Sequence, residues 1–366
     1  MSKLIRLAGA AFAALAAAAL LAGPASAHPQ RSAVFVQTDD PAGNTIVAYD
    51  RAPDGSLSQA GSYRTGGLGG VLDGSVVDHV ASQGSLQLDH GLLYAVNAGS
   101  DTITVFGVDG DRLVRRQVLP SFGHFPASIA VHGNLVYVLN ARGGGSVQGY
   151  ARIGGFLVPI GLWHRALGLD PAAAPEFTHT PGQVAFTPDG DHLLITTKAN
   201  TNAVQAFDVD RLGGLSLRPT TTVLDGAVPF AVDFDARGNL AIAEAGPNAV
   251  ATFGIDRRGA LHPIAQAGTG QAATCWIVNV GGRLYLSNAG SATISAFDAA
   301  LRPVGVTSTH PGTVDAAGSP DGRFLYVQTG AAGGVDAFRV GPDGALTPVG
   351  SVTVPGAAGG EGIAVS

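Results

Sequence analysis

The chain repeats a unit in which short apolar segments alternate with turns rich in glycine, asparagine and serine. Residues 92–106 show the unit clearly: Leu-Leu-Tyr-Ala-Val, then Asn-Ala-Gly-Ser-Asp, then Thr-Ile-Thr-Val-Phe. Residues 284–297 repeat the same order. In the last segment of 92–106, polar and apolar residues alternate with the period of two that is typical of a β-strand. The unit therefore predicts strands joined by tight turns.

The number of repeats follows from an aromatic residue that recurs at the end of each predicted third strand. It occurs seven times, at intervals of 41 to 57 residues: Tyr49, Phe106, Tyr150, Phe207, Phe253, Phe297 and Phe338. Pro-Asp-Gly turns join strands at 53–55, 188–190, 320–322 and 342–344, because Pro presets φ and Gly accepts a positive φ. Repeats of this length with four strands each are typical of a β-propeller. We expect an all-β fold, a seven-bladed β-propeller of four-stranded antiparallel blades, with a six- or eight-bladed ring as the alternative.

The two ends of the chain complete one blade between them. Residues 362–366 read as a first strand with no successor, and residues 33–37 read as a second strand with no predecessor. We therefore expect the C-terminal strand to join the N-terminal blade and close the ring. Closure of this kind removes the exposed strand edge that an open sheet would present.

The N-terminus has the features of a secretory signal peptide. Lys3 and Arg6 precede an unbroken apolar run of 15 residues, and Ala-Ser-Ala at 25–27 provides a cleavage signal. We expect a bacterial Sec-type signal over residues 1–27 with cleavage after Ala27, a single propeller domain over 28–366, and a secreted or extracytoplasmic location. The apolar run is short for a membrane span, and no later segment could cross a bilayer.

Composition narrows the class of partner. The net charge is −6, and no basic stripe suits a nucleic-acid backbone, so we expect no nucleic-acid partner. Hydrophobic residues at 46% and charged residues at 13% exclude an intrinsically disordered chain. Cys275 is the single cysteine, which rules out an intramolecular disulfide and leaves a small buried apolar side chain or a nucleophile as alternatives. We expect a monomer that binds a small molecule, without a metal or another cofactor.

Two repeats are longer than the others and point to insertions. One insertion spans residues 66–83 and contains Asp73, Asp78 and His79. The other spans residues 162–180 and contains Trp163, His164, Arg165, Glu176 and His179. Long loops in a compact domain are more often functional than short connections are.

A ring of polar residues is expected around one mouth of the central channel. In a four-stranded blade, the connections from second to third strand and from fourth to first strand emerge on the same face. The residues that end the second strands are all polar: Gln37, Asn97, Asn140, Lys198, Glu244, Asn288 and Gln328. The charged members Lys198 and Glu244 fall in adjacent blades, where they either serve a site or form a salt bridge between blades. An asparagine at such a position also suits a turn that it stabilises itself.

Further candidates lie near the starts of the first strands. His124 and His179 occupy similar points in consecutive repeats and could transfer protons near neutral pH, or else cap strands as ordinary loop residues. Gln183 follows His179 closely. Arg142 could neutralise a substrate carboxylate, or else be an exposed arginine in a glycine-rich turn.

Two segments carry a resemblance to a known family. Residues 319–327, Ser-Pro-Asp-Gly-Arg-Phe-Leu-Tyr-Val, and residues 97–103, Asn-Ala-Gly-Ser-Asp-Thr-Ile, resemble the seven-bladed lactonase family. That family includes 6-phosphogluconolactonase-type and 3-carboxymuconate-cyclase-type enzymes, and the chain looks similar to a secreted, uncharacterised branch of it. The resemblance implies a propeller with His, Arg and Glu around the channel. Here the matching blade starts with Val-Pro-Phe at 228–230 and lacks the arginine, and Glu244 stands one residue before the family position.

Two functions of different classes follow. In the first, the chain hydrolyses a lactone or cyclises a muconate-type dicarboxylate at the channel mouth. Glu244 or His179 would activate water or move a proton, and Lys198 would stabilise the developing oxyanion. The substrate-binding residues would be Arg142, His124, Asn97, Asn140, Gln183, Asn288 and Gln328. In the second, the chain is a non-catalytic extracytoplasmic propeller that binds a sugar, peptide or protein partner, since one fold hosts many functions.

Overall fold

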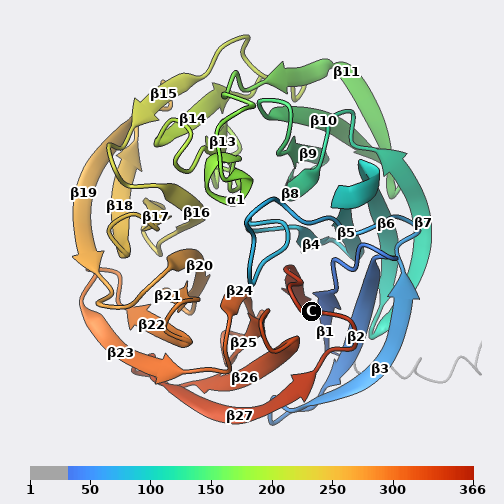
Figure 1. Ribbon diagram of the computed structural model, residues 1–366, viewed down its shortest axis with the longest axis vertical. Helices are drawn as coiled ribbons and strands as arrows, with labels where there is room; N and C mark the ends of the chain where they lie inside the picture. The colour runs from blue at the N-terminus through green and yellow to red at the C-terminus, as the bar shows by residue number, and fades with distance from the viewer. Residues whose placement is uncertain (1–31) are drawn as a thin grey trace, which may run out of the picture. The chain divides into compact units, whose positions relative to one another are not determined.

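The computed structural model describes residues 32–366, and these residues form seven four-stranded antiparallel sheets arranged in a ring (Figure 1). The predicted all-β, seven-bladed propeller is therefore confirmed. The predicted signal peptide, residues 1–27, lies outside the described residues. No helix among the described residues is long and apolar enough to cross a membrane.

The blades are numbered in chain order of their third strands, and each is written from the channel outward. Blade one contains β28 (Ile363–Val365), β1 (Ala33–Gln37), β2 (Thr45–Arg51) and β3 (Leu57–Arg64). Blade two contains β4 (Leu86–Asp89), β5 (Leu92–Asn97), β6 (Thr102–Asp109) and β7 (Arg112–Pro120). Blade three contains β8 (Pro126–His132), β9 (Leu135–Asn140), β10 (Ser146–Ile153) and β11 (Phe156–Ala166). Blade four contains β12 (Val184–Phe186), β13 (His192–Thr196), β14 (Ala203–Asp208) and β15 (Thr220–Val223).

The remaining three blades follow the same order. Blade five contains β16 (Pro229–Phe234), β17 (Leu240–Glu244), β18 (Ala249–Ile255) and β19 (Leu261–Gly268). Blade six contains β20 (Thr274–Val280), β21 (Arg283–Asn288), β22 (Thr293–Phe297) and β23 (Pro303–Ser308). Blade seven contains β24 (Thr313–Gly318), β25 (Phe324–Thr329), β26 (Gly334–Val340) and β27 (Leu346–Thr353). The short helical turns are η1 (Ala98–Ser100) and α1 (Glu176–His179).

The ring closes as the sequence predicts. β28 pairs antiparallel with β1, and Ile363 lies opposite Val36 while Val365 lies opposite Val34. The apolar core fills the space between neighbouring blades, and across the closure Val34 and Val36 share one cluster with Tyr326 of blade seven. Closure thus buries apolar surface as well as satisfying the strand edge.

Tyrosines of the second strands join blades three, six and seven to the blade that follows. Their hydroxyl groups donate to glycine carbonyls in the third-to-fourth turn of the following blade. This bond occurs between Tyr137 and Gly213 (2.6 Å), Tyr285 and Gly344 (2.9 Å), and Tyr326 and Gly55 (2.9 Å). The tyrosine of the recurrent second-strand pattern and the glycine of the recurrent turn are therefore hydrogen-bond partners across the blade interface.

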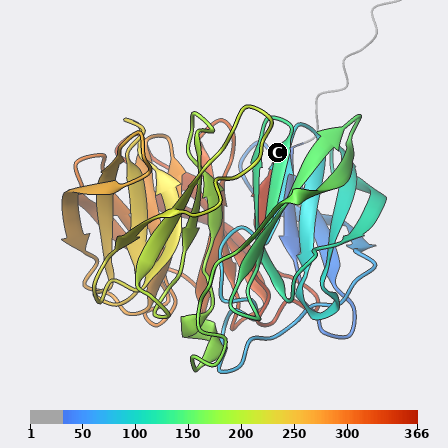
Figure 2. The same cartoon turned by 90° about the horizontal axis from the view of Figure 1, so that it is seen from above.

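Both insertions project from one face of the ring. Figure 2 shows α1 and the loop that leads to β4 beyond the same rim. The second insertion begins later than expected, because β11 continues the outer strand of blade three as far as Ala166. We call this face the insertion face and the channel opening on it the mouth.

Candidate functional site

The first insertion crosses the mouth and divides the channel. Gln83 Nε2 donates to Ile277 O at 2.9 Å, and the Ile277 amide donates back to Gln83 Oε1 at 2.9 Å. Trp276 Nε1 donates to Ser82 O at 2.7 Å. These bonds join blade six to a loop that enters from the opposite side of the ring (Figure 1). We call Ser82 and Gln83 the plug.

Lys198 holds both insertions against the ring. It is the only lysine in residues 32–366 and is fully buried. Its Nζ donates to Ala81 O at 2.7 Å in the first insertion, and to Phe177 O at 2.6 Å and Thr180 Oγ1 at 3.2 Å in the second. Burial lowers the pKa of Lys198 to about 7, against the attraction of Asp78. Three acceptors occupy the three N–H directions of an ammonium group, so Lys198 acts as a clasp for the insertions.

Asp78 shapes the turn of the first insertion that faces Lys198. Its Oδ1 accepts from the amides of Val80 (2.9 Å) and Ala81 (2.8 Å), and its Oδ2 accepts from the Ser82 amide (3.0 Å). Burial raises the pKa of Asp78 to about 8 despite these bonds. The carboxyl group therefore fixes the backbone that leads into the plug.

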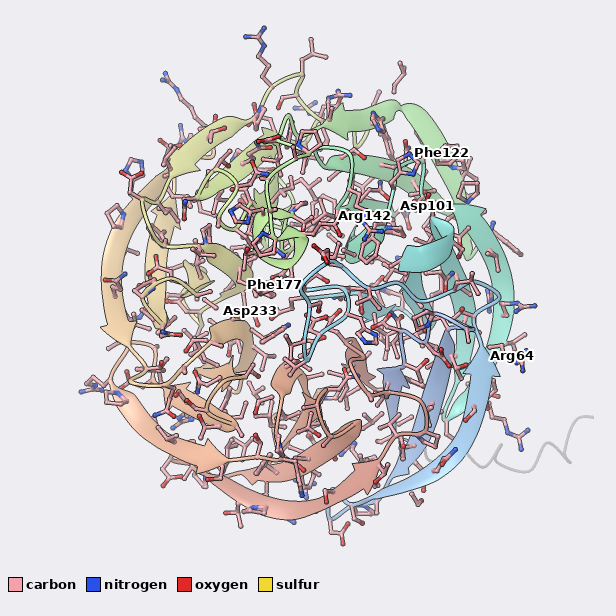
Figure 3. The ribbon with its side chains drawn as sticks, viewed as in Figure 1. Arg64, Asp101, Phe122, Arg142, Phe177 and Asp233 are labelled. Atoms are coloured by element: carbon pink, nitrogen blue, oxygen red, sulfur yellow. The ribbon has the colours of Figure 1, made fainter. Side chains whose placement is uncertain are left out.

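Arg142 ties the insertions together on the outside. Its Nε and Nη2 bond the two carboxylate oxygens of Glu176 at 2.8 and 2.7 Å, and Nη2 also donates to Val71 O at 3.2 Å. The guanidinium lies 4.5 Å from the ring centroid of Phe125. The bond from Arg142 lowers the pKa of Glu176. Figure 3 shows Arg142 and Phe177 near the ring centre, where the insertions meet.

A mouth pocket of about 270 Å³ lies between the insertions and the starts of the inner strands. Its walls include Phe177, Phe230, Cys275 and Trp276, and Lys198 contributes to the lining. Its polar atoms are engaged elsewhere, so the surface that it presents is almost entirely apolar. Burial raises the pKa of the Cys275 thiol to about 12, which keeps this group protonated.

A second and larger hollow, the channel cavity, lies beyond the plug. It has a volume of about 720 Å³ and extends to the first-to-second strand turns on the opposite face. The plug, the inner strands and the residue before β12 supply polar groups to its wall: Gln83, Gln87, Gln183, Asp233, Asn279 and Asp315. Neither lysine nor arginine occurs among the described residues that line it, so the cavity is polar and acidic.

Two aspartates of the cavity play parallel roles in the inner strands of blades five and seven. Asp233 accepts from its own successor Phe234 (2.7 Å) and from the Asn279 amide of the next blade (2.6 Å). Asp315 likewise bonds the amide of its successor at 2.9 Å and the Ile363 amide of the next blade. Burial raises the pKa of each carboxyl group to about 6. Each aspartate thus joins two blades at the channel wall.

Asp315 differs from Asp233 because it has an acidic neighbour. A hydrogen bond with the Glu361 side chain lowers the pKa of Asp315 against the larger effect of burial. Glu361 is fully buried, and burial together with nearby carboxylates raises its pKa well above the ordinary value. Its backbone amide donates to Asp39 Oδ2 at 2.8 Å. Glu361 therefore binds its proton more tightly than an ordinary carboxyl group does, beside the Asp315 side chain.

Two amide groups complete the cavity. Gln183 Oε1 accepts from the Val232 amide at 2.6 Å, and the Nε2 group of Gln183 has no hydrogen-bond partner in residues 32–366. The Gln87 side chain, half-buried at the cavity wall, also lacks a protein partner within this range. The cavity therefore presents free N–H donors together with a carboxylate whose pKa lies near neutrality.

The structure separates the residues that the sequence placed in one ring. Gln266 Nε2 of the outer strand β19 donates to Glu244 Oε2 at 2.5 Å, so Glu244 extends over its own blade, and burial raises its pKa. The amide N–H groups of the three asparagines are bonded nearby: Asn97 to Thr102 and Thr104, Asn140 to Ser146 and Ser121, and Asn288 to Thr293 and Ser295. Only Lys198 among these residues lines the mouth pocket.

The remaining candidates are placed apart from both hollows, except Gln183. His124 Nδ1 lies 2.8 Å from Asp101 Oδ2, and its side chain is 76% exposed. His179 ends α1, where its Nδ1 lies 3.1 Å from Pro175 O. Gln328 Nε2 donates to Gln37 O at 3.1 Å across the ring closure.

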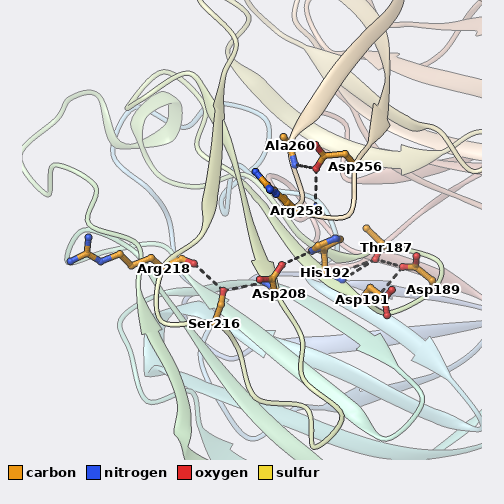
Figure 4. A network of polar contacts seen from close by, with 10 residues as sticks. All are labelled: Thr187, Asp189, Asp191, His192, Asp208, Ser216, Arg218, Asp256, Arg258 and Ala260. Atoms are coloured by element: carbon orange, nitrogen blue, oxygen red, sulfur yellow. Dashed lines mark hydrogen bonds and ion pairs between the residues drawn. The ribbon is translucent and has the colours of Figure 1, made fainter.

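A third hollow lies between blades four and five, away from the channel. It has a volume of about 630 Å³ and is acidic (Figure 4). Its carboxylates build turns: Asp189 accepts from the Asp191 amide at 3.1 Å, and Asp256 accepts from the Arg258 amide at 2.9 Å. His192 Nδ1 lies 3.2 Å from Asp208. Across the described residues, no group of three His, Cys, Asp or Glu side chains is placed to hold a metal ion.

Of the residues that line the channel cavity, the sequence predicted Gln183 as a site residue but not Asp315. Asp315 and Glu361 both lie near the start of an inner strand, and acidic residues at that repeat position are the signal that could have found them. The plug carried no such signal, because its bonds to blade six depend on how the first insertion folds across the ring.

No protein-family model and no curated protein sequence matches the chain. Among solved structures it is similar to a periplasmic gluconolactonase of Pseudomonas aeruginosa, with a TM-score of 0.70 and 17% identity over 91% of this chain and 98% of that one. A candidate 6-phosphogluconolactonase of Bacteroides fragilis gives a TM-score of 0.68 and 17% identity over 93% and 99%. Virginiamycin B lyase of Staphylococcus aureus gives 0.55 and 11% over 79% and 90%. At these identities the likeness concerns the fold, and the chain has the seven-bladed fold of the 6-phosphogluconolactonase-like propellers.

Proposed function

We propose that this chain is an exported, lactonase-like propeller that hydrolyses an uncharged lactone in the channel cavity. The observation that carries the proposal is Asp315, a buried carboxyl group in the cavity wall that lies beside the buried carboxyl group of Glu361. Its pKa of about 6 leaves it ionised at neutral pH and still basic enough to accept a proton. Two lactonase-type neighbours in the same fold support the reaction class.

The reaction proceeds through a tetrahedral intermediate. Asp315 removes a proton from a water molecule while the water oxygen bonds to the lactone carbonyl carbon. The carbonyl electrons move to oxygen, and the free Nε2 groups of Gln87 and Gln183 stabilise that oxyanion by hydrogen bonding. Collapse of the intermediate breaks the ring C–O bond, and the departing ring oxygen takes the proton from Asp315. The product is the hydroxy acid, and Asp315 returns to its carboxylate form.

The charge of the cavity selects the substrate class. Asp233, Asp315 and Asp321 line it, and no lysine or arginine among the described residues does. A phosphorylated lactone or a muconate-type dicarboxylate would meet carboxylates without a compensating cation. Lys198, which the sequence suggested as the oxyanion-stabilising cation, has all its N–H groups bonded on the other side of the plug. We therefore favour a neutral lactone over an anionic one and over cyclisation of a dicarboxylate.

The enzyme experiment uses a panel of uncharged five- and six-membered lactones with anionic lactones beside them. Asp315→Asn should abolish most turnover, because the amide cannot accept the proton. Asp233→Asn is the matched control, since it removes the same kind of link between blades without an acidic partner. Glu244→Gln should leave turnover unchanged, because Glu244 contacts the outer strand. Equal losses in both aspartate variants would assign Asp315 a structural role only.

A non-catalytic sugar-binding propeller is the second candidate, favoured by the free amides of Gln87 and Gln183. Calorimetric binding of the same neutral lactones and of their hydroxy acids distinguishes the two. Binding without turnover, equally tight in Asp315→Asn, would establish the second candidate and contradict the first.

Export is the part of the proposal that rests on the N-terminal sequence. The full chain, expressed in a bacterial host, should be recovered outside the cytoplasm with His28 as its first residue. Recovery of uncleaved chain from the cytoplasm alone would contradict export.

A further inference from the structure

We propose that the mouth pocket binds a small, uncharged aromatic molecule, at a site separate from the channel cavity. The pocket lies on the insertion face, and the plug closes it off from the cavity. The inference does not depend on lactone hydrolysis, because no residue of the proposed reaction lines the mouth pocket.

The size of the pocket fits one or two fused rings. Its volume is about 270 Å³. An engineered apolar cavity of about 150 Å³ binds benzene, so this pocket has room for a ring with a substituent or for a second ring. It is too small for a folded peptide segment.

Aromatic side chains form much of the wall. Phe230 and Trp276 lie with their ring centroids 5.0 Å apart and their planes tilted by 59°. Phe177, from the second insertion, faces the pocket from the other side. Aromatic side chains favour tilted or offset contacts with another ring, so a flat ring inserted among them gains contact on both faces and edges.

The pocket offers no charge to a ligand. Lys198 directs its N–H groups to three protein oxygens, and both Asp78 oxygens accept backbone amides. The Cys275 thiol remains protonated in its buried position. A charged ligand would lose its hydration without a partner, so an uncharged one is selected.

The backbone of the pocket wall is held in an unusual conformation. Val228, which lines the pocket, has φ of 48°, in the left-handed region that a β-branched residue rarely adopts. The neighbouring wall residue Ala273 has φ of 54°. Such strained positions cluster at ligand sites. Since both insertions contribute walls, a bound ring would also hold them together over the mouth.

Calorimetry with toluene and p-cresol tests the proposal, with benzoate as the charged ring of similar size. The expected result is saturable one-to-one binding of the two uncharged compounds and at least tenfold weaker binding of benzoate. Ala289→Leu, which adds bulk at the pocket wall, should abolish binding, while Ala300→Leu in an exposed turn of blade six should retain it. Far-ultraviolet circular dichroism checks that each variant is folded, and Ala245→Leu serves as a second filling variant.

A fluorescence measurement locates the ligand independently. The chain has two tryptophans, Trp163 and Trp276, and Trp276 alone lines the pocket. In the Trp163→Phe variant, toluene should shift the fluorescence emission of Trp276. The shift should saturate at the same toluene concentrations as the heat of binding measured by calorimetry. Absence of saturable binding, equal binding by Ala289→Leu, or benzoate binding as tight as that of toluene would each overturn the proposal. None of these outcomes bears on lactone turnover in the channel cavity. Failure of the binding proposal can therefore be distinguished from failure of the proposed hydrolysis.

Discussion

Arg142→Ala should open the insertions and expose Lys198. Arg142 makes the bidentate contact with Glu176 and the bond to Val71 O, so it joins the second insertion to the first. Without it, the clasp at Lys198 and the bonds of Asp73 to Glu176 and Phe177 remain, but the ion pair that fixes Glu176 is lost. We expect the insertions to open locally more often while the blades stay folded.

The magnitude follows from the exposure of the pair. The Arg142 and Glu176 side chains are 41% and 31% exposed, so solvent screens the pair, and we assign it about 1 kcal/mol. The contact of the guanidinium with Phe125 adds about 0.5 kcal/mol. Together these favour the closed state by about 1.5 kcal/mol, which corresponds to roughly a tenfold change in the opening equilibrium.

Amine acylation measures the opening directly, because Lys198 is the only lysine in residues 32–366. An N-hydroxysuccinimide ester is added at neutral pH, and peptide mapping by mass spectrometry separates Lys198 from other amines. Acylation of Lys198 should be slow in the unaltered chain and about tenfold faster in Arg142→Ala. Arg302→Ala, which removes an exposed pair with Asp298 in blade six, is the matched control and should change nothing. A rate in Arg142→Ala within twofold of the unaltered chain would refute the view that Arg142 holds the insertions closed.

Two further predictions concern stability. Tyr326→Phe removes the buried bond to Gly55 O (2.9 Å) and should lower the free energy of unfolding, measured by urea titration, by about 1 kcal/mol. Tyr63→Phe is the control and should lower it by less, because the contact of Tyr63 with Asp111 O is longer at 3.5 Å. Equal losses in the two variants would contradict the role given to the tyrosine contacts between blades. Burial raises the pKa of Asp39 to about 7 and that of Asp78 to about 8, so both bind protons more tightly when folded, and the free energy of unfolding should fall as the pH rises from about 4 to about 8. Asp78→Asn should make that slope shallower in urea titrations at several pH values, and an unchanged slope would contradict the assignment.

The seven-bladed ring could be predicted from the sequence because each repeat is specified by residues close together along the chain. Each strand and turn follows from neighbouring residues, as in the Pro-Asp-Gly turns, and the seven third-strand aromatics set the number of blades. The two ends complete one blade between them, because β28 pairs with β1. These features need no knowledge of how side chains cross the channel.

The site could not be predicted in the same way, because it depends on contacts between distant segments. Lys198 was identified as an unusual charge, but its partners Ala81 and Phe177 belong to the two insertions, whose paths over the mouth the repeats do not determine. Glu244 ends a second strand just as Lys198 follows one, yet its shorter side chain stays over its own blade and meets Gln266. The different surroundings of Lys198 and Glu244 therefore depend on side-chain length and on the fold of the insertions. The repeat pattern does not determine how the insertions fold.

The pairing of Asp315 with Glu361 likewise arises from ring closure. Asp315 belongs to β24 of blade seven, and Glu361 precedes β28, the strand that completes blade one. Only the closed ring brings them together. Either residue read alone is an acid at the start of a strand, whereas in the closed ring burial raises the pKa of both, and the charge of Asp315 raises that of Glu361 further.

The pH dependence of lactone hydrolysis in Asp315→Asn and Asp233→Asn tests the proposed function most directly. With an uncharged lactone, kcat/KM of the unaltered chain should rise with pH through about 6 and then level off, because Asp315 must be ionised to accept a proton. Asp315→Asn should lower kcat/KM by about 100-fold or more and remove this pH dependence, while Asp233→Asn should keep both the rate and the profile. Equal rates and profiles in the two variants, or no turnover of any lactone by the unaltered chain, would contradict the assignment of Asp315 as the base.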